Sequence, residues 1–256
     1  MRPEAHLIPN QIRKVHFSMK KNGVQALLMG GQACIYYGGA EFSHDTDFAV
    51  LCEPQNLARL GAALDELGAK VVAVPPLEAD FLERGFAVQF RCTRVDCAGL
   101  RVDVMSKMRG VAPFPTLWER RTTAIEEGQE IEIMDLADLI QAKKTKRDKD
   151  WPMIRRLVEA HFLKFKDEAS PARLDFWLRE SRTPKILQEI MEEHPNETFA
   201  AYAVRPWLRT PRLSLWRAAL RNEEDWEREA DRACWAPLRA EIEALRLSRA
   251  RELRNR

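Results

Sequence analysis

The pattern of apolar residues changes near Asp135, and this change limits the folds open to the chain. Before that point, short apolar runs bounded by turn residues predict strands at residues 24–29, 48–52, 70–74, 86–90 and 100–105. Between the second and third runs, residues 54–67 repeat leucine and alanine at helical spacing, with Pro54 suited to a first turn and Gly68 to a C-terminal cap. This half is expected to be a mixed sheet flanked by helices.

From Asp135 onward the sequence predicts helices alone. Leu136, Leu139 and Ile140 recur at the helical period, and prolines then divide the chain before a longer helix over residues 223–251. The dividing prolines are Pro171, Pro184, Pro195, Pro206 and Pro211. We therefore expect an α+β protein with two domains, in which residues 1–150 hold the sheet and residues 151–256 form a small all-helical domain.

Composition excludes some classes of protein and names no partner. The 256 residues are 45% hydrophobic and 31% charged, with a formal net charge of +2 and no apolar run long enough to cross a membrane. The N-terminus lacks an apolar signal region, so a soluble, cytoplasmic protein is expected. The five scattered cysteines predict reduced thiols, and the close pair Cys92 and Cys97 lacks the second pair or clustered histidines of a zinc site.

Two adjacent glycines lie where the first strand turns into a helix. Gly30 and Gly31 follow the run at 24–29, and a helical pattern begins with residues 32–37. Backbone N–H groups at such a turn can bind a phosphate. The alternative is a tight turn that binds nothing.

Two aspartates open the second strand. The alternation of a strand places Asp45 and Asp47 on one face, and paired carboxylates bind hard divalent cations such as Mg²⁺, which is often shared with substrate phosphates. A metal site beside phosphate-binding glycines is one interpretation. A solvated strand start with two turn-favouring aspartates is the other.

A third acid interrupts an apolar strand. Asp103 lies within the run at 100–105, on the face that also carries Arg101. If this strand lies beside the Asp47 strand, three carboxylates converge, and metal ions would be needed to offset their repulsion. Asp96 is the competing acid, and we interpret it as a residue of the connecting turn.

Gly30-Gly31, then Asp45-x-Asp47, then Asp103 in an apolar strand together resemble the DNA polymerase β-type nucleotidyltransferase superfamily. The resemblance covers about residues 20–160 and implies a polymerase β palm-like mixed sheet. It further implies that Gly30 and Gly31 hold a nucleoside triphosphate. Asp45, Asp47 and Asp103 would be the catalytic residues and the ligands of Mg²⁺ or Mn²⁺, and Asp103 would also help to activate the incoming hydroxyl.

A second segment is similar to the bacterial branch of that superfamily that is related to abortive-infection toxins. Residues 134–143 and then Arg147-Asp148-Lys149-Asp150 resemble its helix with Lys-x-x-x-Arg and Arg-x-x-Asp. The resemblance implies that Lys143 and Arg147 contact phosphates of the nucleotide, and we expect Asp150 to orient this basic helix. Without the upstream acids, the cationic run at residues 143–147 would be interpreted as a solvated helix end. His44 is interpreted as a packing or surface residue.

Helix packing is the simplest role for the aromatic side chains of the second half, and stacking on a substrate base or ring is the alternative. They are Phe176, Trp177, Trp207, Trp216, Trp226 and Trp235. The arginine-rich end, residues 246–256, is interpreted as a solvated tail, with an RNA contact as the alternative.

These features predict a Mg²⁺-dependent nucleotidyltransferase that moves NMP from an NTP to a hydroxyl and releases pyrophosphate. The first hypothesis for the acceptor is tRNA or a protein, in a toxin-like enzyme with a cognate antitoxin as a partner. The alternatives are an antibiotic-modifying enzyme that acts on a small hydroxylated drug, and a non-catalytic scaffold that binds a nucleotide or RNA.

Overall fold

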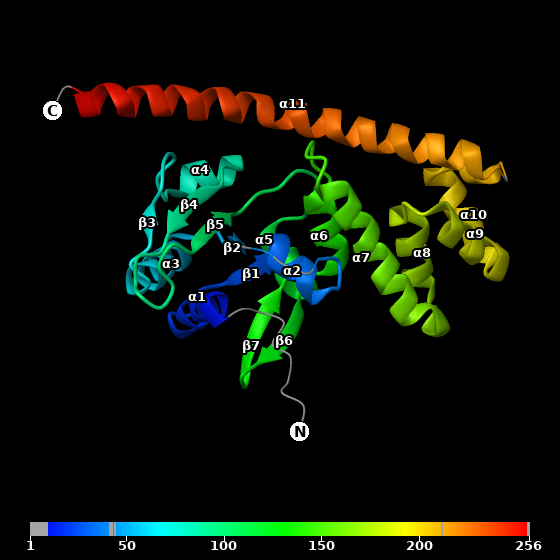
Figure 1. Cartoon of the computed structure of the whole chain (residues 1–256), viewed down its shortest axis with the longest axis horizontal. Helices are drawn as coiled ribbons and strands as arrows, with labels where there is room; N and C mark the ends of the chain where they lie inside the picture. The colour runs from blue at the N-terminus through cyan, green and yellow to red at the C-terminus, as the bar shows by residue number, and fades with distance from the viewer. Residues whose placement is uncertain (1–9, 41–42, 44, 211, 255–256) are drawn as a thin grey trace. The chain divides into compact units, whose positions relative to one another are not determined.

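A mixed sheet organises the N-terminal part of the chain (Figure 1). The computed structural model describes residues 10–40, 43, 45–210 and 212–254. Within these residues, seven strands pair in the order β3-β4-β5-β2-β1-β7-β6. The strands are β1 (Ala26–Met29), β2 (Asp45–Val50), β3 (Lys70–Val71), β4 (Val88–Arg91), β5 (Arg101–Met105), β6 (Thr122–Glu126) and β7 (Gln129–Ile133). Each of the five strands expected from the sequence is present, with bounds that differ by a few residues.

The pairing puts the two acid-bearing strands side by side near the middle of the sheet. β2 runs parallel to β5 on one side and antiparallel to β1 on the other, and β1 runs parallel to β7. The outer pairs β3–β4, β4–β5 and β6–β7 are antiparallel. A mixed sheet flanked by helices and followed by a helical region is the α+β fold class that the sequence predicts.

The sequence analysis did not predict the hairpin β6–β7. Its two strands are joined at Glu127 and Gly128, whose φ angles of 51° and 73° are both positive, as a tight two-residue hairpin turn requires. The Glu-Gly dipeptide and the alternation after it were the available signals. The short apolar-run criterion did not detect them because threonine, glutamine and glutamate residues interrupt the apolar positions of the two strands.

Helices surround this sheet. They are α1 (Asn10–Lys21), α2 (Gly30–Tyr36), α3 (Pro54–Glu66), α4 (Ala79–Arg84), α5 (Phe114–Arg120) and α6 (Leu136–Lys143). The expected helix after Pro54 is confirmed as α3, and Gly68 follows its end with a φ of +59°, which suits the predicted glycine cap.

One face of β2 packs against α1. Phe48 is fully buried, and the imidazole of His16 lies edge-on to its ring at a centroid distance of 4.9 Å. Ser18 of α1 donates a hydrogen bond to the Ala63 carbonyl of α3 at 2.9 Å, which ties the two helices together. Burial lowers the pKa of His16 to about 3, so the ring is neutral at physiological pH.

Contacts divide the chain into two units. The first holds the described residues of 10–36, 43–142 and 233–254, and the second holds residues 37–40 and the described part of 143–232. The domain boundary at residue 150 stays a prediction. Asp45, Asp47 and Asp103 belong to the first unit, and Lys143 and Arg147 belong to the second.

The second unit is helical, as expected after Asp135. Its remaining elements are α7 (Asp150–Phe165), η1 (Lys166–Glu168), α8 (Pro171–Glu180), α9 (Pro184–Glu193), α10 (Pro195–Val204), η2 (Pro206–Arg209) and the first part of α11 (Leu213–Arg254). Pro171, Pro184, Pro195 and Pro206 each open a helix, and Pro211 lies outside the described residues. The expected long helix is longer than residues 223–251 and contains Pro237. No helix of the described residues is long and apolar enough to span a membrane.

Candidate functional site

Asp45 and Asp47 begin strand β2, where the alternation predicted from the sequence is seen directly. The intervening Thr46 is fully buried, whereas the Asp45 side chain is 46% exposed and Asp47 is half-buried. The two carboxylates therefore share the opposite face of the strand. We call Asp45, Asp47 and Asp103 together the acid site.

The third acid lies beside them because of the parallel register between β2 and β5. Asp103 pairs with Asp47, and Arg101 pairs with Asp45. The adjacent strand β4 continues the two rows with Gln89 opposite Asp103 and Arg91 opposite Arg101. The condition set out for a convergent site, that the Asp103 strand neighbours the Asp47 strand, is thus fulfilled.

An arginine holds Asp103. Arg101 Nε donates to Asp103 Oδ1 at 2.9 Å and its Nη2 donates to Oδ2 at 2.6 Å, while Nη1 lies 3.9 Å from Asp45 Oδ2. Hydrogen bonding to Asp103 raises the pKa of Arg101, and the acids Asp103, Asp45 and Asp47 add to the effect. Gln89 Nε2 lies 3.5 Å from Asp103 Oδ2. The Arg101 guanidinium therefore offsets the repulsion among the three carboxylates, a role that the sequence analysis assigned to metal ions.

The acid side chains do not form a closed set of metal ligands as they lie here. Among the residues that the structure describes, no group of three His, Cys, Asp or Glu side chains is arranged to hold a metal ion. The predicted convergence is therefore seen in the pairing of the strands, which puts the three acids in neighbouring positions. It is not seen in the positions of the side chains, which are not arranged around one metal ion. The role of Arg101 was not foreseen, although its place on the Asp103 face could be read from the sequence.

The glycine turn lies against the acid site. Gly30 has a φ of +67°, and a Cβ placed on it would lie 1.8 Å from Asp47 Oδ2. A Cβ on Gly31 would lie 2.4 Å from Ser43 Oγ. The helix begins at Gly30 itself, earlier than expected. Both glycines are thus required for close approach, and Gly30 also for its left-handed conformation.

These residues fit a hard divalent cation. Asp45 and Asp47 offer only carboxylate oxygens, the donors that Mg²⁺ and Mn²⁺ prefer, and Asp47 occupies the space where a side chain on residue 30 would lie. Exposure of Asp45 leaves a route from solvent. Asp103 also offers carboxylate oxygens, and Arg101 engages both of them.

The two predicted phosphate-binding cations share a buried partner. Asp150 is 1% exposed, and its Oδ2 accepts from Arg147 Nε at 2.7 Å and from Thr145 Oγ1 at 2.6 Å, while Lys143 Nζ lies 3.6 Å from its Oδ1. Asp150 therefore orients the basic segment, as expected. The segment is not one helix, because α6 ends at Lys143 and Arg147 lies in the loop before α7.

Asp96 and the close cysteine pair are not part of the acid site. Asp96 is confirmed as a turn residue; its carboxylate pairs with Arg94 at 2.7 Å and Lys14 at 3.1 Å, which lowers its pKa to about 2. His44 lies outside the described residues. Cys92 and Cys97 are buried free thiols, and burial raises the pKa of Cys92 to about 12.

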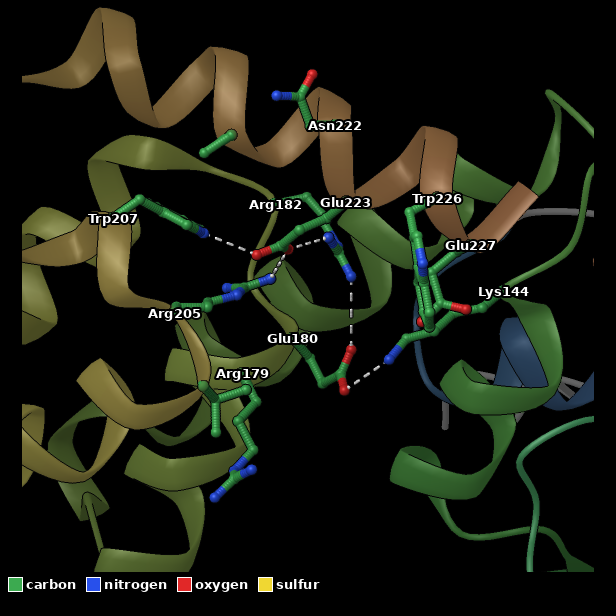
Figure 2. Close-up of a pocket in the computed structure, with 12 residues that line it drawn as sticks. Lys144, Arg179, Glu180, Arg182, Arg205, Trp207, Asn222, Glu223, Trp226 and Glu227 are labelled. Atoms are coloured by element: carbon green, nitrogen blue, oxygen red, sulfur yellow. Dashed lines mark hydrogen bonds and ion pairs between the residues drawn. The ribbon is translucent and has the colours of Figure 1, made fainter. Parts of the chain in front are cut away.

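Figure 2 shows a cavity of about 560 Å³ in the second unit, which the sequence analysis did not detect. At its centre the Glu223 carboxylate accepts from Arg182 at 2.7 Å, Arg205 at 2.8 Å and Trp207 Nε1 at 2.9 Å. The side chains of both arginines are only 3% exposed. Burial, and then the neighbouring Arg182, lowers the pKa of Arg205 to about 10.

The same cavity corrects one expectation about the aromatic residues. Trp177 and Trp216 are buried helix-packing anchors, as predicted, but Trp226 is 67% exposed and lines the cavity (Figure 2). Lys144, another lining residue, donates to Glu180 at 2.9 Å. The cavity wall is therefore built largely from ion pairs that the second unit makes within itself.

Comparisons with known proteins give structural likenesses only. No protein-family model and no curated protein matches the chain. One similar solved structure is an antigenic nucleotidyltransferase-like protein from Paracoccidioides brasiliensis, with 12% identity and a TM-score of 0.37 over 72% of this chain and 98% of that one. Another is ANT(2")-Ia in complex with adenylyl-2"-tobramycin, with 13% identity and a TM-score of 0.34 over 83% of this chain and 95% of that one.

Proposed function

We propose that this chain is a divalent-metal-dependent nucleotidyltransferase that transfers NMP from an NTP to an acceptor hydroxyl and releases pyrophosphate. The observation that supports this most directly is the register between β2 and β5, which pairs Asp47 with Asp103 two residues from Asp45. The second support is the left-handed Gly30 turn packed against Asp47. Both features are needed to bring phosphate oxygens close to carboxylate-bound metal.

Each residue of the site has a distinct task in this proposal. Asp45 and Asp47 hold Mg²⁺ or Mn²⁺, which when bound supplies positive charge to the phosphate oxygens. Gly30 and Gly31 leave room for the triphosphate. Asp103 would be the third carboxylate ligand of this metal. It accepts the proton of the acceptor hydroxyl as the hydroxyl oxygen bonds to the α-phosphorus and the bond from phosphorus to the pyrophosphate oxygen breaks. Phosphate contact by Lys143 and Arg147 stays a prediction from the resemblance.

For the acceptor, we propose a hydroxyl of tRNA or of a protein. The enzyme would then be toxin-like and inhibited by a cognate antitoxin. This choice rests on the sequence resemblance of the segment that ends at Asp150. A small hydroxylated drug and a scaffold without activity are the competing outcomes of the experiments below.

The donor site is tested by titrating each of the four NTPs into the protein by calorimetry, with and without Mg²⁺. We expect Mg²⁺-dependent binding that is lost in Asp47→Asn. The matched control is Asp65→Asn, because Asp65 is an exposed aspartate of α3 and the change in charge is the same. The proposal fails if no NTP binds in the presence of Mg²⁺, or if Asp47→Asn binds as the wild type does.

The acceptor is tested by label transfer from each α-labelled NTP. Total tRNA, cell protein and aminoglycosides are offered in separate reactions, with the Asp45→Asn, Asp47→Asn double variant as the control. Label in tRNA or protein supports the proposed acceptor, and label in the drug alone favours the antibiotic-modifying alternative. Transfer that survives the double change would show that these carboxylates do not hold the metal.

A further inference from the structure

We propose that Arg101 is a built-in cation of the acid site and that it competes with a divalent metal ion for the Asp103 carboxylate. The inference rests on the proposed metal-binding function of Asp45 and Asp47. It adds a residue that the sequence resemblance does not assign and a property of the site, namely two mutually exclusive arrangements of Asp103.

The first support is that the guanidinium engages both oxygens of Asp103. The two hydrogen bonds, 2.9 Å to Oδ1 and 2.6 Å to Oδ2, form a two-pronged, charge-assisted pair, the strongest kind that a carboxylate makes with a side chain. The Asp103 side chain is only 9% exposed, so few other donors can reach it. A metal ion that used either oxygen would meet the positive charge of Arg101 at hydrogen-bond distance.

The second support is that Arg101 can leave without any change in the backbone. Its side chain is 36% exposed, so the guanidinium has a route to water that Asp103 lacks. Arg101 and Asp103 are two residues apart on the same face of β5, and the pairing of β5 with β2 depends on backbone hydrogen bonds. Rotation of one side chain would therefore open Asp103 while the register with Asp47 stays fixed.

The third support is that Arg101 also faces the proposed metal ligands. It pairs with Asp45 in the parallel register, and its Nη1 lies 3.9 Å from Asp45 Oδ2. One guanidinium thus faces both Asp103 and Asp45, the acids that a shared metal ion would also contact. Arginine and metal ion consequently exclude one another.

Mn²⁺ is the probe for this competition, because free aqueous Mn²⁺ gives a paramagnetic resonance signal that is lost on binding. The titrations use wild type, Arg101→Gln and the control Arg91→Gln. Arg91 is exposed and lies opposite Arg101 in the β4–β5 register, so its replacement removes the same charge from the same sheet face. We expect Arg101→Gln to bind Mn²⁺ about tenfold more tightly than wild type, since a charge-assisted pair no longer has to be broken.

The control variant is expected to stay within about twofold of wild type, because an exposed charge is screened. The effect should also depend on Asp103: in an Asp103→Asn background, Arg101→Gln should give no gain in Mn²⁺ affinity. Thermal unfolding adds a readout that does not need activity. Arg101→Gln should unfold at a lower temperature than wild type without metal, and Mn²⁺ should raise its unfolding temperature by more.

The outcomes separate this inference from the proposed function. Equal Mn²⁺ affinity in wild type and Arg101→Gln, with loss of binding in Asp47→Asn, would overturn the competition and leave the metal site standing. Weaker binding in Arg101→Gln would overturn it as well, because Arg101 would then assist the metal. If neither wild type nor Arg101→Gln binds Mn²⁺, the metal site and the inference both fail.

Discussion

At the scale of single residues, the acid site depends on the absence of a Cβ atom at Gly30. Gly30 adopts a φ of +67°, and the Asp47 carboxylate lies where its Cβ would be. Two independent requirements, backbone conformation and space, therefore fall on the same residue. A substitution there tests the site more selectively than a change in an acid, because all three carboxylates remain.

Gly30→Ala is expected to lower the free energy of unfolding by more than about 1–2 kcal/mol, the cost of a left-handed backbone alone, because the methyl group also displaces Asp47. Mn²⁺ binding should weaken with it. The control is Gly61→Ala, in α3, where a Cβ meets nothing within 4 Å. That change should stabilise the protein by about 0.5–1 kcal/mol. Urea unfolding measures both, and equal effects would contradict the packing described for Gly30.

His16 links stability to pH. Its folded pKa of about 3 lies below the unfolded value of 6.5, so between these values the unfolded chain binds the extra proton. The contribution is fully present above the unfolded pKa and is lost as pH falls toward the folded one. Up to about 1.4 kcal/mol per pH unit should be lost through this group below about pH 6.5.

His16→Leu removes the titrating group and keeps an apolar side chain beside Phe48. We expect its free energy of unfolding to fall less steeply than that of the wild type between about pH 7 and pH 5. Urea unfolding at several pH values gives the comparison. Parallel profiles for the two proteins would mean that folding does not lower the pKa of His16.

At the scale of elements, the sequence predicts those whose residues carry an unmixed pattern. α3 is such a case, with apolar spacing, an opening proline and a glycine after its end. β2 and β5 were found because their apolar residues cluster, and the aspartates stood out against them. The hairpin β6–β7 was missed because polar residues interrupt the apolar positions of both strands, and in β6 the apolar Ile125 is exposed while Glu126 is buried. The sequence does not show which strands pair with one another. The register of each pair could therefore not be predicted either.

The same limit explains what was missed in the site. Asp45, Asp47 and Asp103 were identified by residue type, and their proximity depended on an assumption about strand order that the structure bears out. That Arg101 would bind Asp103 with both prongs is a matter of side-chain rotation, on which spacing gives no information. Arg147 was assigned to a helix by the resemblance of residues 134–150 to a family signature, whereas the helix ends four residues earlier.

The start of α8 offers a test at this scale. Ser170 caps the helix, and its Oγ accepts from the Arg173 backbone N–H at 3.3 Å. Ser170→Ala should lower the free energy of unfolding by about 1 kcal/mol. Ser248→Ala, at an exposed position inside α11, should change it by less than about 0.5 kcal/mol. A Ser170→Ala protein as stable as wild type would show that the cap contributes nothing.

At the scale of the whole molecule, the two units are stabilised differently. The sheet of the first unit is held by backbone pairing and apolar packing, whereas the second unit concentrates charge around Glu223 (Figure 2). Arg182 and Arg205 come from the chain on either side of α9 and α10 and meet on one carboxylate from α11. Removal of that carboxylate leaves two buried cations without their shared anion.

Glu223→Gln is therefore expected to lower the free energy of unfolding by about 3 kcal/mol, because breaking a buried ion pair costs more than the pair contributes. The control is Glu229→Gln, also on α11, whose pair with Arg232 is exposed on both sides. Its loss should cost less than about 1 kcal/mol. Urea unfolding distinguishes the two, and a mild effect of Glu223→Gln would show that water reaches the two guanidiniums.

The pairing of Arg101 with Asp103 bears on how the chain is made in a cell. If the carboxylates of β2 and β5 had no cation of their own, these strands could join only against repulsion or once metal arrived, and newly synthesised protein would depend on metal supply. Asp103 instead has a guanidinium two residues away on its own strand. The strands β2 and β5 can therefore pair with a cation that the chain itself supplies.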